Sequence, residues 1–323
     1  MVKRATLIPA VAVLWTFSFG SIDSTAQQVP ESTAQGAPIA AFASRVDLVQ
    51  VTAIVRDRKG RFVGDLTKRD FEILDGGVRQ PISDFRSDLS GVSVAVLFDA
   101  SGSMKALMGQ ARESVGHLLS WLENGRDEVA LFTFDTRLDE VASFTTDLAV
   151  LPAHLDAVRP FGATSLHDAI AQTAERASAR LGRRRAVIVF TDGHDNFSRL
   201  KPGEVSGIAS AIDVPIYIVG LVSLVDNPSA DVGAVSGGQS SLAGPLSDLT
   251  AWTGGRTFVV STSAQRSVVA RQMVEELRHQ YLMAFESSGR PGWHPLEVRA
   301  LGNDLNVRAR SGYIAGQSRP ISQ

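Results

Sequence analysis

The feature of this sequence that most constrains its fold is an uninterrupted apolar segment, followed by a stretch with one apolar face. Residues 94–98 are all apolar, which is typical of a strand covered on both faces. The apolar side chains after it recur at intervals of three and four residues, as in an amphipathic helix: Met104, Leu107, Met108, Ala111, Val115, Leu118, Leu119 and Leu122. A buried strand followed by such a helix predicts an α/β domain.

Strand and helix patterns continue to alternate after this first pair. Further strands are predicted at residues 129–134, 186–191, 215–221 and 257–260. Helices are predicted between them, one with Leu166, Ile170 and Leu181 on its apolar face, and a last one near residues 267–280. Regular alternation of this kind favours an open, doubly wound and mostly parallel sheet of the Rossmann-like type.

Residues 45–90 follow a β pattern instead. The positions from 48 to 55 alternate and are rich in β-branched residues, as in a half-buried strand. The turn Asp75-Gly76-Gly77 indicates a hairpin. This part is too small to be stable without strands from elsewhere in the chain.

Short strands are predicted again after the last helix, at residues 281–285, 296–300 and 305–309. Because the two ends of a domain commonly lie close together, we expect residues 281–314 to join residues 45–90 in one small β-sandwich-like module. The α/β domain, residues 91–280, would then be inserted between the two parts of that module.

The amino terminus has the pattern of a secretory signal. Lys3 and Arg4 precede an apolar segment, and Ser24 and Ala26 have the spacing of a signal-peptidase site. We therefore expect residues 1–26 to be a signal peptide and the protein to be exported, either periplasmic or secreted, with no membrane span in the mature form. The alternative is an uncleaved membrane anchor. Residues 27–44 are predicted to be a flexible linker and residues 315–323 a tail.

Composition excludes several classes of function. The chain has 32 basic and 34 acidic residues, and this balance is unlike the strongly basic footprint of a nucleic-acid-binding protein. It has no cysteine, which excludes disulfides, thiolate metal sites and cysteine nucleophiles. With 44% hydrophobic residues it has enough apolar material for a packed core.

Oxygen-bearing side chains follow several predicted strands at their carboxyl ends. They are Asp99, Ser101, Ser103, Thr164 and Asp192. Ligands of open α/β sheets bind at this edge, so we expect the three segments that carry these residues to meet there. Carboxylates and hydroxyls are hard donors that suit Mg²⁺, Mn²⁺ or Ca²⁺ and disfavour zinc. We therefore predict a divalent cation site, with Mg²⁺ as the expected ion.

The spacing of these residues also indicates what the cation would bind. Asp99, Ser101 and Ser103 alternate, so an extended loop can direct all of them to one centre. The hydroxyls are neutral, which leaves Asp99 and Asp192 as the carboxylates of the set. If one of them reaches the ion through water, the ion keeps unmatched charge and an open position. Such a position favours a carboxylate from a protein ligand.

The complete set resembles the metal-ion-dependent adhesion site (MIDAS) of von Willebrand factor A domains: Asp99-x-Ser101-x-Ser103, Thr164 and Thr191-Asp192-Gly193. The resemblance implies that Ser101 and Ser103 bind the ion directly, and Asp99 directly or through water. It implies that Thr164 and Asp192 bind according to the state of the ligand. The flanking residues 70–76 and 307–313 resemble the exported "VWFA-related" proteins of acidobacteria, whose biochemical roles are mostly unassigned.

Three functions are consistent with these residues. The preferred one is an exported protein-binding, adhesion-type module, and the others are a metal-dependent hydrolase at the same site and an envelope scaffold in which the metal is only structural. His194 and Asp195 follow Asp192 and suggest a catalytic pair, but rim or supporting roles are the preferred interpretation. Because the sequence offers no convincing general base, we expect a binding protein and not an enzyme. The oligomeric state is not indicated.

Other charged groups receive structural interpretations. The basic run at residues 183–185 is interpreted as a solvated helix end. Asp65, Asp70 and Asp75 are interpreted as turn and surface acids because they lack the calcium-loop pattern. His167 begins a predicted helix and is assigned a capping or packing role.

A Gly- and Ser-rich segment, residues 223–245, interrupts the α/β domain after a predicted strand. A loop after a parallel strand emerges at the same edge of the sheet as Asp99 and Asp192. The segment is either part of the recognition rim or a spacer without a role in binding.

Overall fold

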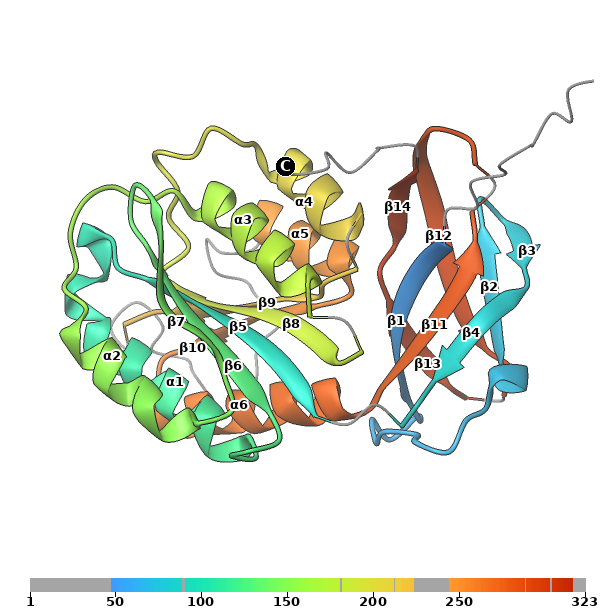
Figure 1. Cartoon of the computed structure of the whole chain (residues 1–323), viewed down its shortest axis with the longest axis horizontal. Coiled ribbons are helices and arrows are strands. Elements are labelled where there is room, and N and C mark those ends of the chain that lie inside the picture. The colour runs from blue at the N-terminus through green and yellow to red at the C-terminus, as the bar shows by residue number, and fades with distance from the viewer. Residues whose placement is uncertain are drawn as a thin grey trace, which may run out of the picture. The chain divides into compact units, whose positions relative to one another are not determined.

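The computed structural model describes residues 48–88, 91–180, 182–211, 213–223, 244–287, 289–302 and 304–315 (Figure 1). The expected signal peptide and linker lie outside these ranges, as do nearly all of the segment 223–245 and all of the expected tail except Ala315, which belongs to a strand. Within these ranges no helix combines the length and the apolar character needed to cross a membrane.

A central sheet has the strand order β10-β9-β8-β5-β6-β7. Its strands are β5 (Val92–Asp99), β6 (Glu128–Phe134), β7 (Leu138–Thr145), β8 (Arg184–Thr191), β9 (Ile216–Leu221) and β10 (Arg256–Val260). All pairs are parallel except that of β6 with β7. Every residue of β5 is buried, as the apolar run predicts.

Helices cover both faces of this sheet (Figure 1). On one face lie α1 (Met108–Trp121), α2 (Leu151–Ala157) and α6 (Ser263–Arg278). On the other lie α3 (Leu166–Ser178), α4 (Pro202–Ala211) and α5 (Pro245–Thr253). Alternate residues of β5 divide between the two cores, with Val96 in one and Ala95 in the other. The predicted doubly wound α/β class is confirmed.

Two details of the α/β domain differ from the sequence prediction. The edge strand β7 was not predicted, since it is only half-buried, includes Asp139 and Glu140, and pairs with β6 through an irregular register. The last helix begins at Ser263 and not near residue 267, because Thr262 and Gln265 form a capping box.

Two further sheets come from the two ends of the described chain. One has the order β13-β1-β11-β4 and the other β14-β12-β2-β3. Their strands are β1 (Leu48–Arg56), β2 (Phe71–Asp75), β3 (Val78–Gln80), β4 (Ile82–Arg86), β11 (Gln280–Glu286), β12 (Gly292–Ala300), β13 (Asn306–Ala309) and β14 (Gly312–Ala315). A 3₁₀ helix, Lys68–Asp70, precedes β2.

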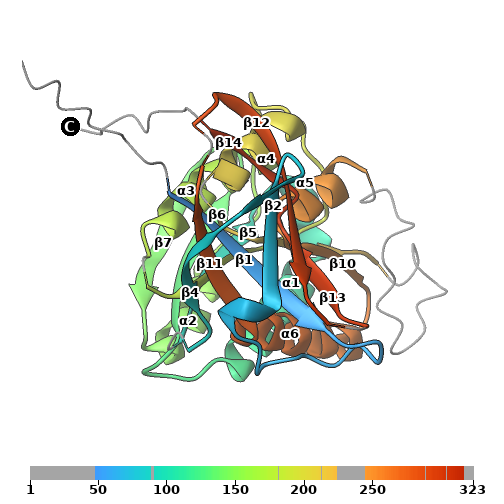
Figure 2. The ribbon, with the colours of Figure 1, turned by 90° about the vertical axis from the view of Figure 1, so that its right-hand side faces the viewer.

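Strands from far apart in the sequence share one core in this β module. The long strand β1 pairs with β11 on one side, with Val51 opposite Met283, and with β13 on the other (Figure 2). Val51, Ile73 and Phe285 are fully buried in the same cluster. The prediction that the α/β domain is inserted into a small β module is confirmed.

The basic run and one acidic residue are placed differently from the prediction. Arg185 belongs to β8, is buried, and donates to the Ser178 carbonyl and the Gln50 side chain. The interpretation of this run as a solvated helix end is therefore wrong for Arg185. Asp75 is also buried, so its interpretation as a surface acid is wrong.

Asp75 is the hydrogen-bond acceptor at the centre of a buried polar cluster in the β module. It accepts from Tyr313 Oη at 2.9 Å and lies 2.9 Å from His294 Nδ1. His294 Nε2 lies 2.7 Å from the Arg290 carbonyl oxygen, so both ring nitrogens face acceptors and the imidazolium form suits the site. Burial lowers the pKa of His294, but the hydrogen bonds to Arg290 and Asp75 outweigh it and raise the pKa above its usual value.

This cluster predicts a pH-dependent contribution to stability. Because the native pKa of His294 is raised, its protonated side chain adds to the free energy of unfolding. This contribution is complete below the unfolded-state pKa of about 6.5 and is lost as pH rises through the native pKa. His294→Gln should therefore lower the free energy of unfolding more at pH 5.5 than at pH 9, by about 1–3 kcal/mol at the lower pH. Urea denaturation at both pH values measures this.

His154→Gln is the matched control, because His154 is exposed on α2. It should change the free energy of unfolding little at either pH. An equal loss for His294→Gln at pH 5.5 and pH 9 would show that His294 is neutral in the native state.

Candidate functional site

The neighbouring strands β5 and β8 place Asp99 beside the segment that carries Asp192. The strands are parallel, with Phe98 opposite Phe190, so both end at the same edge of the sheet. The Asp99 side chain is buried there, accepting from Thr191 Oγ1 at 2.6 Å and from the Ser101 backbone N–H at 2.9 Å. The Asp99 carboxylate is thus held by both strands.

The chain after β5 turns into a 3₁₀ helix, Gly102–Ala106, that carries the serines. Ser101 is buried and Ser103 is exposed, and their Oγ atoms lie 3.1 Å apart. The Gly102 N–H donates to the Gly162 carbonyl at 3.0 Å, and a Cβ on Gly102 would lie only 3.2 Å from that oxygen. The glycine therefore allows this segment to approach the loop before α3.

That loop carries Thr164 and is held by the segment after β8. Thr164 is buried, and its backbone N–H donates to Asn196 Oδ1 at 2.9 Å. Its carbonyl accepts from the N–H groups of Asn196 and Phe197. Among the described residues, no hydrogen bond joins the Thr164 side chain to the other four predicted site residues. The three segments thus meet mainly through backbone contacts.

Asp192 lies close enough to Asp99 for its negative charge to raise the pKa of the Asp99 carboxyl group. Its side chain is mostly buried, and its Oδ1 accepts from the His194 N–H at 3.1 Å. Burial raises the pKa of Asp99 to about 6, with a smaller contribution in the same direction from the negative charge of Asp192. A carboxyl group in this situation is one that a nearby cation would stabilise in its charged form.

His194 and Asp195 do not form the pair that their adjacency suggests. His194 is 74% exposed and lies 3.1 Å from Asp192. Asp195 instead lies 2.5 Å from His167 Nδ1 and accepts from the His167 backbone N–H, at the start of α3. Asp195 therefore fixes the amino-terminal end of α3, and His167 has a structural partner in it.

The donor set fits a hard divalent cation. It consists of carboxylate and hydroxyl oxygens, and in the described part of the chain no three His, Asp or Glu side chains form a group that could hold a metal. A cation here would therefore depend on the hydroxyls of Ser101, Ser103 and Thr164. The 3.1 Å between the two serine oxygens is close to the roughly 3.0 Å between adjacent oxygens of octahedral Mg²⁺.

Three residues support the site without being among the five predicted ligands, and Thr191 is one that the motif Thr191-Asp192-Gly193 includes. Thr191 has a weak signal, a hydroxyl at the strand end directly before Asp192. The sequence gives no signal for Asn196 or Phe161, because each supports the site by a hydrogen bond to another loop and the sequence does not show which loops meet. The Phe161 N–H donates to the Ala100 carbonyl, which links the loop before α3 to the segment after β5.

A comparison with known protein families finds a match in the part of the chain that carries the candidate site. Residues 94–194 match the family described as von Willebrand factor type A domain, and this match spans all five predicted site residues. This part of the chain is therefore similar to a von Willebrand factor type A domain. No curated protein sequence matches the chain.

Several solved structures are similar in part. The conserved hypothetical protein BatB from Bacteroides thetaiotaomicron is 19% identical, with 58% of this chain and 98% of that chain covered and a TM-score of 0.46. A von Willebrand factor type A protein from Catenulispora acidiphila is 11% identical, covering 84% and 75%, with a TM-score of 0.46. The pilus adhesin SpaC from Lactobacillus rhamnosus GG is 10% identical, covering 76% and 48%, with a TM-score of 0.47. At these values the likenesses carry no information on function.

The hydrogen bond from Thr191 to Asp99 predicts that replacing Thr191 lowers the free energy of unfolding. Thr191→Val keeps the shape of the side chain but removes the donor to a buried carboxylate, so the free energy of unfolding should fall by about 1.5–3 kcal/mol. Urea denaturation at pH 7.5 measures the loss.

Thr173→Val is the matched control, because Thr173 is also fully buried and its Oγ1 has no hydrogen-bond partner among the described residues. Its replacement should be neutral or stabilising. Equal losses in the two variants would mean that the hydrogen bond to Asp99 is not what stabilises the strand ends.

Proposed function

We propose that this protein is an adhesion-type binding protein that captures a carboxylate of a protein ligand through a divalent cation. Asp99, Ser101, Ser103, Thr164 and Asp192 would hold the cation, with Mg²⁺ expected and Mn²⁺ or Ca²⁺ suited to the same oxygens. The signal-like amino terminus supports a location in the periplasm or outside the cell.

The charge and the position of the donors support capture of a carboxylate. The set has three neutral hydroxyls and two carboxylates, and Asp99 already accepts two hydrogen bonds from the protein. A divalent cation held partly through Asp99 or water would keep uncompensated positive charge. An acidic side chain from another protein is a ligand of matching charge and donor type.

The observation that carries the proposal is the pair of exposed aromatic rings on the loops that form this site. Phe161 is 77% exposed and Phe197 is 57% exposed. Each is anchored by its backbone N–H to a segment with a predicted cation ligand, Phe161 through Ala100 and Phe197 through Thr164. Exposed aromatic rings beside a charged centre are typical of a protein-binding surface, where they become buried on association.

The proposal predicts cation binding that depends on Asp99 and Ser103. Isothermal titration calorimetry with MgCl₂ should show one site in the unaltered chain and none in Asp99→Ala, because the variant lacks a carboxylate ligand. Ser103→Ala should weaken binding by at least roughly tenfold. Because Ser103 is exposed, this variant should fold normally by circular dichroism.

Asp139→Ala removes an exposed carboxylate on β7 and should bind Mg²⁺ like the unaltered chain. Unchanged affinity in both Asp99→Ala and Ser103→Ala would rule out the assigned ligands.

The aromatic residues predict a second, separable effect. Phe161→Ser and Phe197→Ser should leave Mg²⁺ affinity unchanged and reduce the capture of envelope or secreted proteins that are retained with Mg²⁺ and released by chelator. Quantitative mass spectrometry of the retained proteins measures this.

Trp121→Ser is the control, since Trp121 is a partly exposed aromatic at the far end of α1. Capture that is insensitive to chelator would instead support a scaffold in which the metal is structural. Capture that is as strong in both phenylalanine variants as in the unaltered chain would remove these rings from the binding surface.

A further inference from the structure

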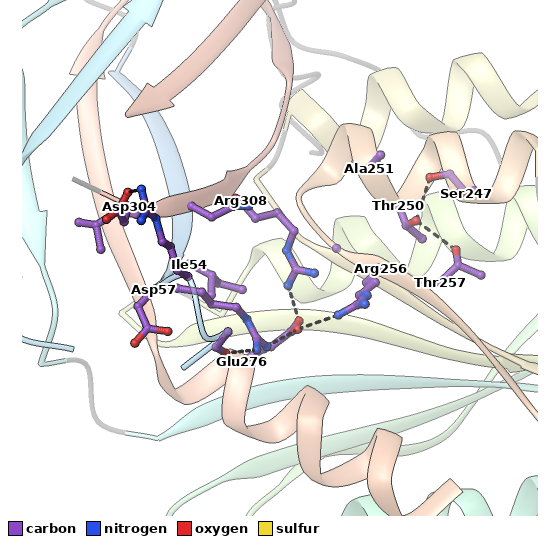
Figure 3. Close-up of a pocket in the computed structure, with 16 residues that line it drawn as sticks. Ile54, Asp57, Ser247, Thr250, Ala251, Arg256, Thr257, Glu276, Asp304 and Arg308 are labelled. Atoms are coloured by element: carbon purple, nitrogen blue, oxygen red, sulfur yellow. Dashed lines mark hydrogen bonds and ion pairs between the residues drawn. The ribbon is translucent and has the colours of Figure 1, made fainter. Parts of the chain in front are cut away.

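A cavity of about 840 Å³ lies between the β module and the α/β domain, away from the candidate cation site. Its walls come from β1 and the segment that leads into β13 on one side, and from α5, β10 and α6 on the other (Figure 3). None of the five predicted cation ligands lines it. Its volume is in the range of pockets that bind small molecules.

Three arginines converge on one carboxylate in this cavity. The Glu276 side chain is 0% exposed, with Arg56 Nη2 at 3.0 Å and Arg256 Nη1 at 3.7 Å from its Oε1. Arg308 forms an ion pair with the other oxygen, Oε2. Figure 3 shows the Arg308 and Arg256 side chains directed towards Glu276. The cluster therefore has three positive charges and one negative charge.

The other charged residues of the lining do not balance this excess of positive charge. Arg58 pairs with Asp304, and Asp57 pairs with Arg61, so these charges cancel locally. Two positive charges remain on the cluster around Glu276. Burial, together with the nearby charges of Arg308 and Arg56, lowers the pKa of Arg256 despite the opposing effect of Glu276.

One donor in the cluster is also unused. Arg308 Nε is buried and has no hydrogen-bond partner among the described residues. A buried donor without an acceptor is costly. The side chains of Arg56, Arg256 and Arg308 are 29%, 40% and 30% exposed, so a ligand in the cavity can reach their positive charges. Ion pairing that only joined the two parts of the molecule would need no excess of arginine. A dianion bound here would supply both the charge and the acceptors.

The rest of the cavity lining has a different chemistry. Ile54, Ala251 and Leu305 give it apolar wall. Thr250 Oγ1 donates to the Ser247 carbonyl at 2.9 Å, so in its 3.1 Å contact with Thr257 the Thr257 hydroxyl is the donor. The Thr257 oxygen therefore has lone pairs left to accept from a hydroxyl group.

We propose that this cavity binds a small hydroxylated phosphate monoester, of the sugar phosphate class. The phosphoryl group is held by Arg56, Arg256 and Arg308, whose excess of two charges matches a phosphate dianion. The hydroxylated part lies along the apolar wall and donates to Thr257. The site is independent of the proposed cation site and needs no metal.

Calorimetric titration of the full-length chain tests the ligand class, with glucose 6-phosphate, gluconate, glucose and inorganic phosphate as probes. Glucose 6-phosphate should bind saturably at one site per chain, equally with and without EDTA. Gluconate, a monoanion of similar size, should bind at least tenfold more weakly, and glucose should not bind. Equal affinity for gluconate, no saturable binding of glucose 6-phosphate, or loss of binding in EDTA would overturn the proposal.

Variants locate the site. Arg256→Ala should weaken glucose 6-phosphate binding at least tenfold while keeping the fold, since Arg256 is the arginine with the longer 3.7 Å contact to Glu276. Arg58→Ala is the matched control, because Arg58 lines the same cavity but is paired with Asp304. This variant should bind glucose 6-phosphate with unchanged affinity.

Thr257→Val tests the hydroxyl contact separately. It should weaken glucose 6-phosphate binding and leave inorganic phosphate binding unchanged, because only the sugar reaches Thr257. Unchanged glucose 6-phosphate affinity in both Arg256→Ala and Thr257→Val would show that the molecule binds elsewhere.

Discussion

The candidate site depends on the parallel pairing of β5 with β8 inside a sheet that is covered on both faces. Their register brings Asp99 and Thr191 to the same edge, where the threonine hydroxyl binds the carboxylate. Since Asp99 is removed from water, its charge must be balanced by hydrogen bonds or by a cation. The loops before α3 and after β8 then attach to this fixed point through their backbones.

The sequence predicted those parts of the fold that depend on local pattern. The continuous apolar run of residues 94–98 predicted a covered strand, and the regular recurrence of apolar residues in α1 and α3 predicted amphipathic helices. The five oxygen-bearing residues were predictable as a set because the ends of parallel strands share an edge. Whether their side chains hold a cation, and where the domain limits of residues 45–90, 91–280 and 281–314 lie, remain predictions.

The side-chain partners that individual residues find in distant segments were not predictable. Asp75 has the hairpin sequence of a surface turn, yet its partners His294 and Tyr313 come from the other end of the chain and bury it. Arg185 became a buried strand residue for the same reason, since Gln50 lies in the β module. The cavity around Glu276 is lined by residues from both the β module and the α/β domain, so no local sequence motif indicates it.

The pairing of β1 with β11 also determines the order in which this protein can form during its synthesis. β1 is made before the α/β domain, and both strands that flank it, β11 and β13, are made after it. Until then Val51 and Val55 have no core, which leaves an apolar strand with two open edges and a risk of aggregation. The sheet of the α/β domain is encoded in one continuous stretch and can form first, so closing the β module is the non-local and therefore slow step.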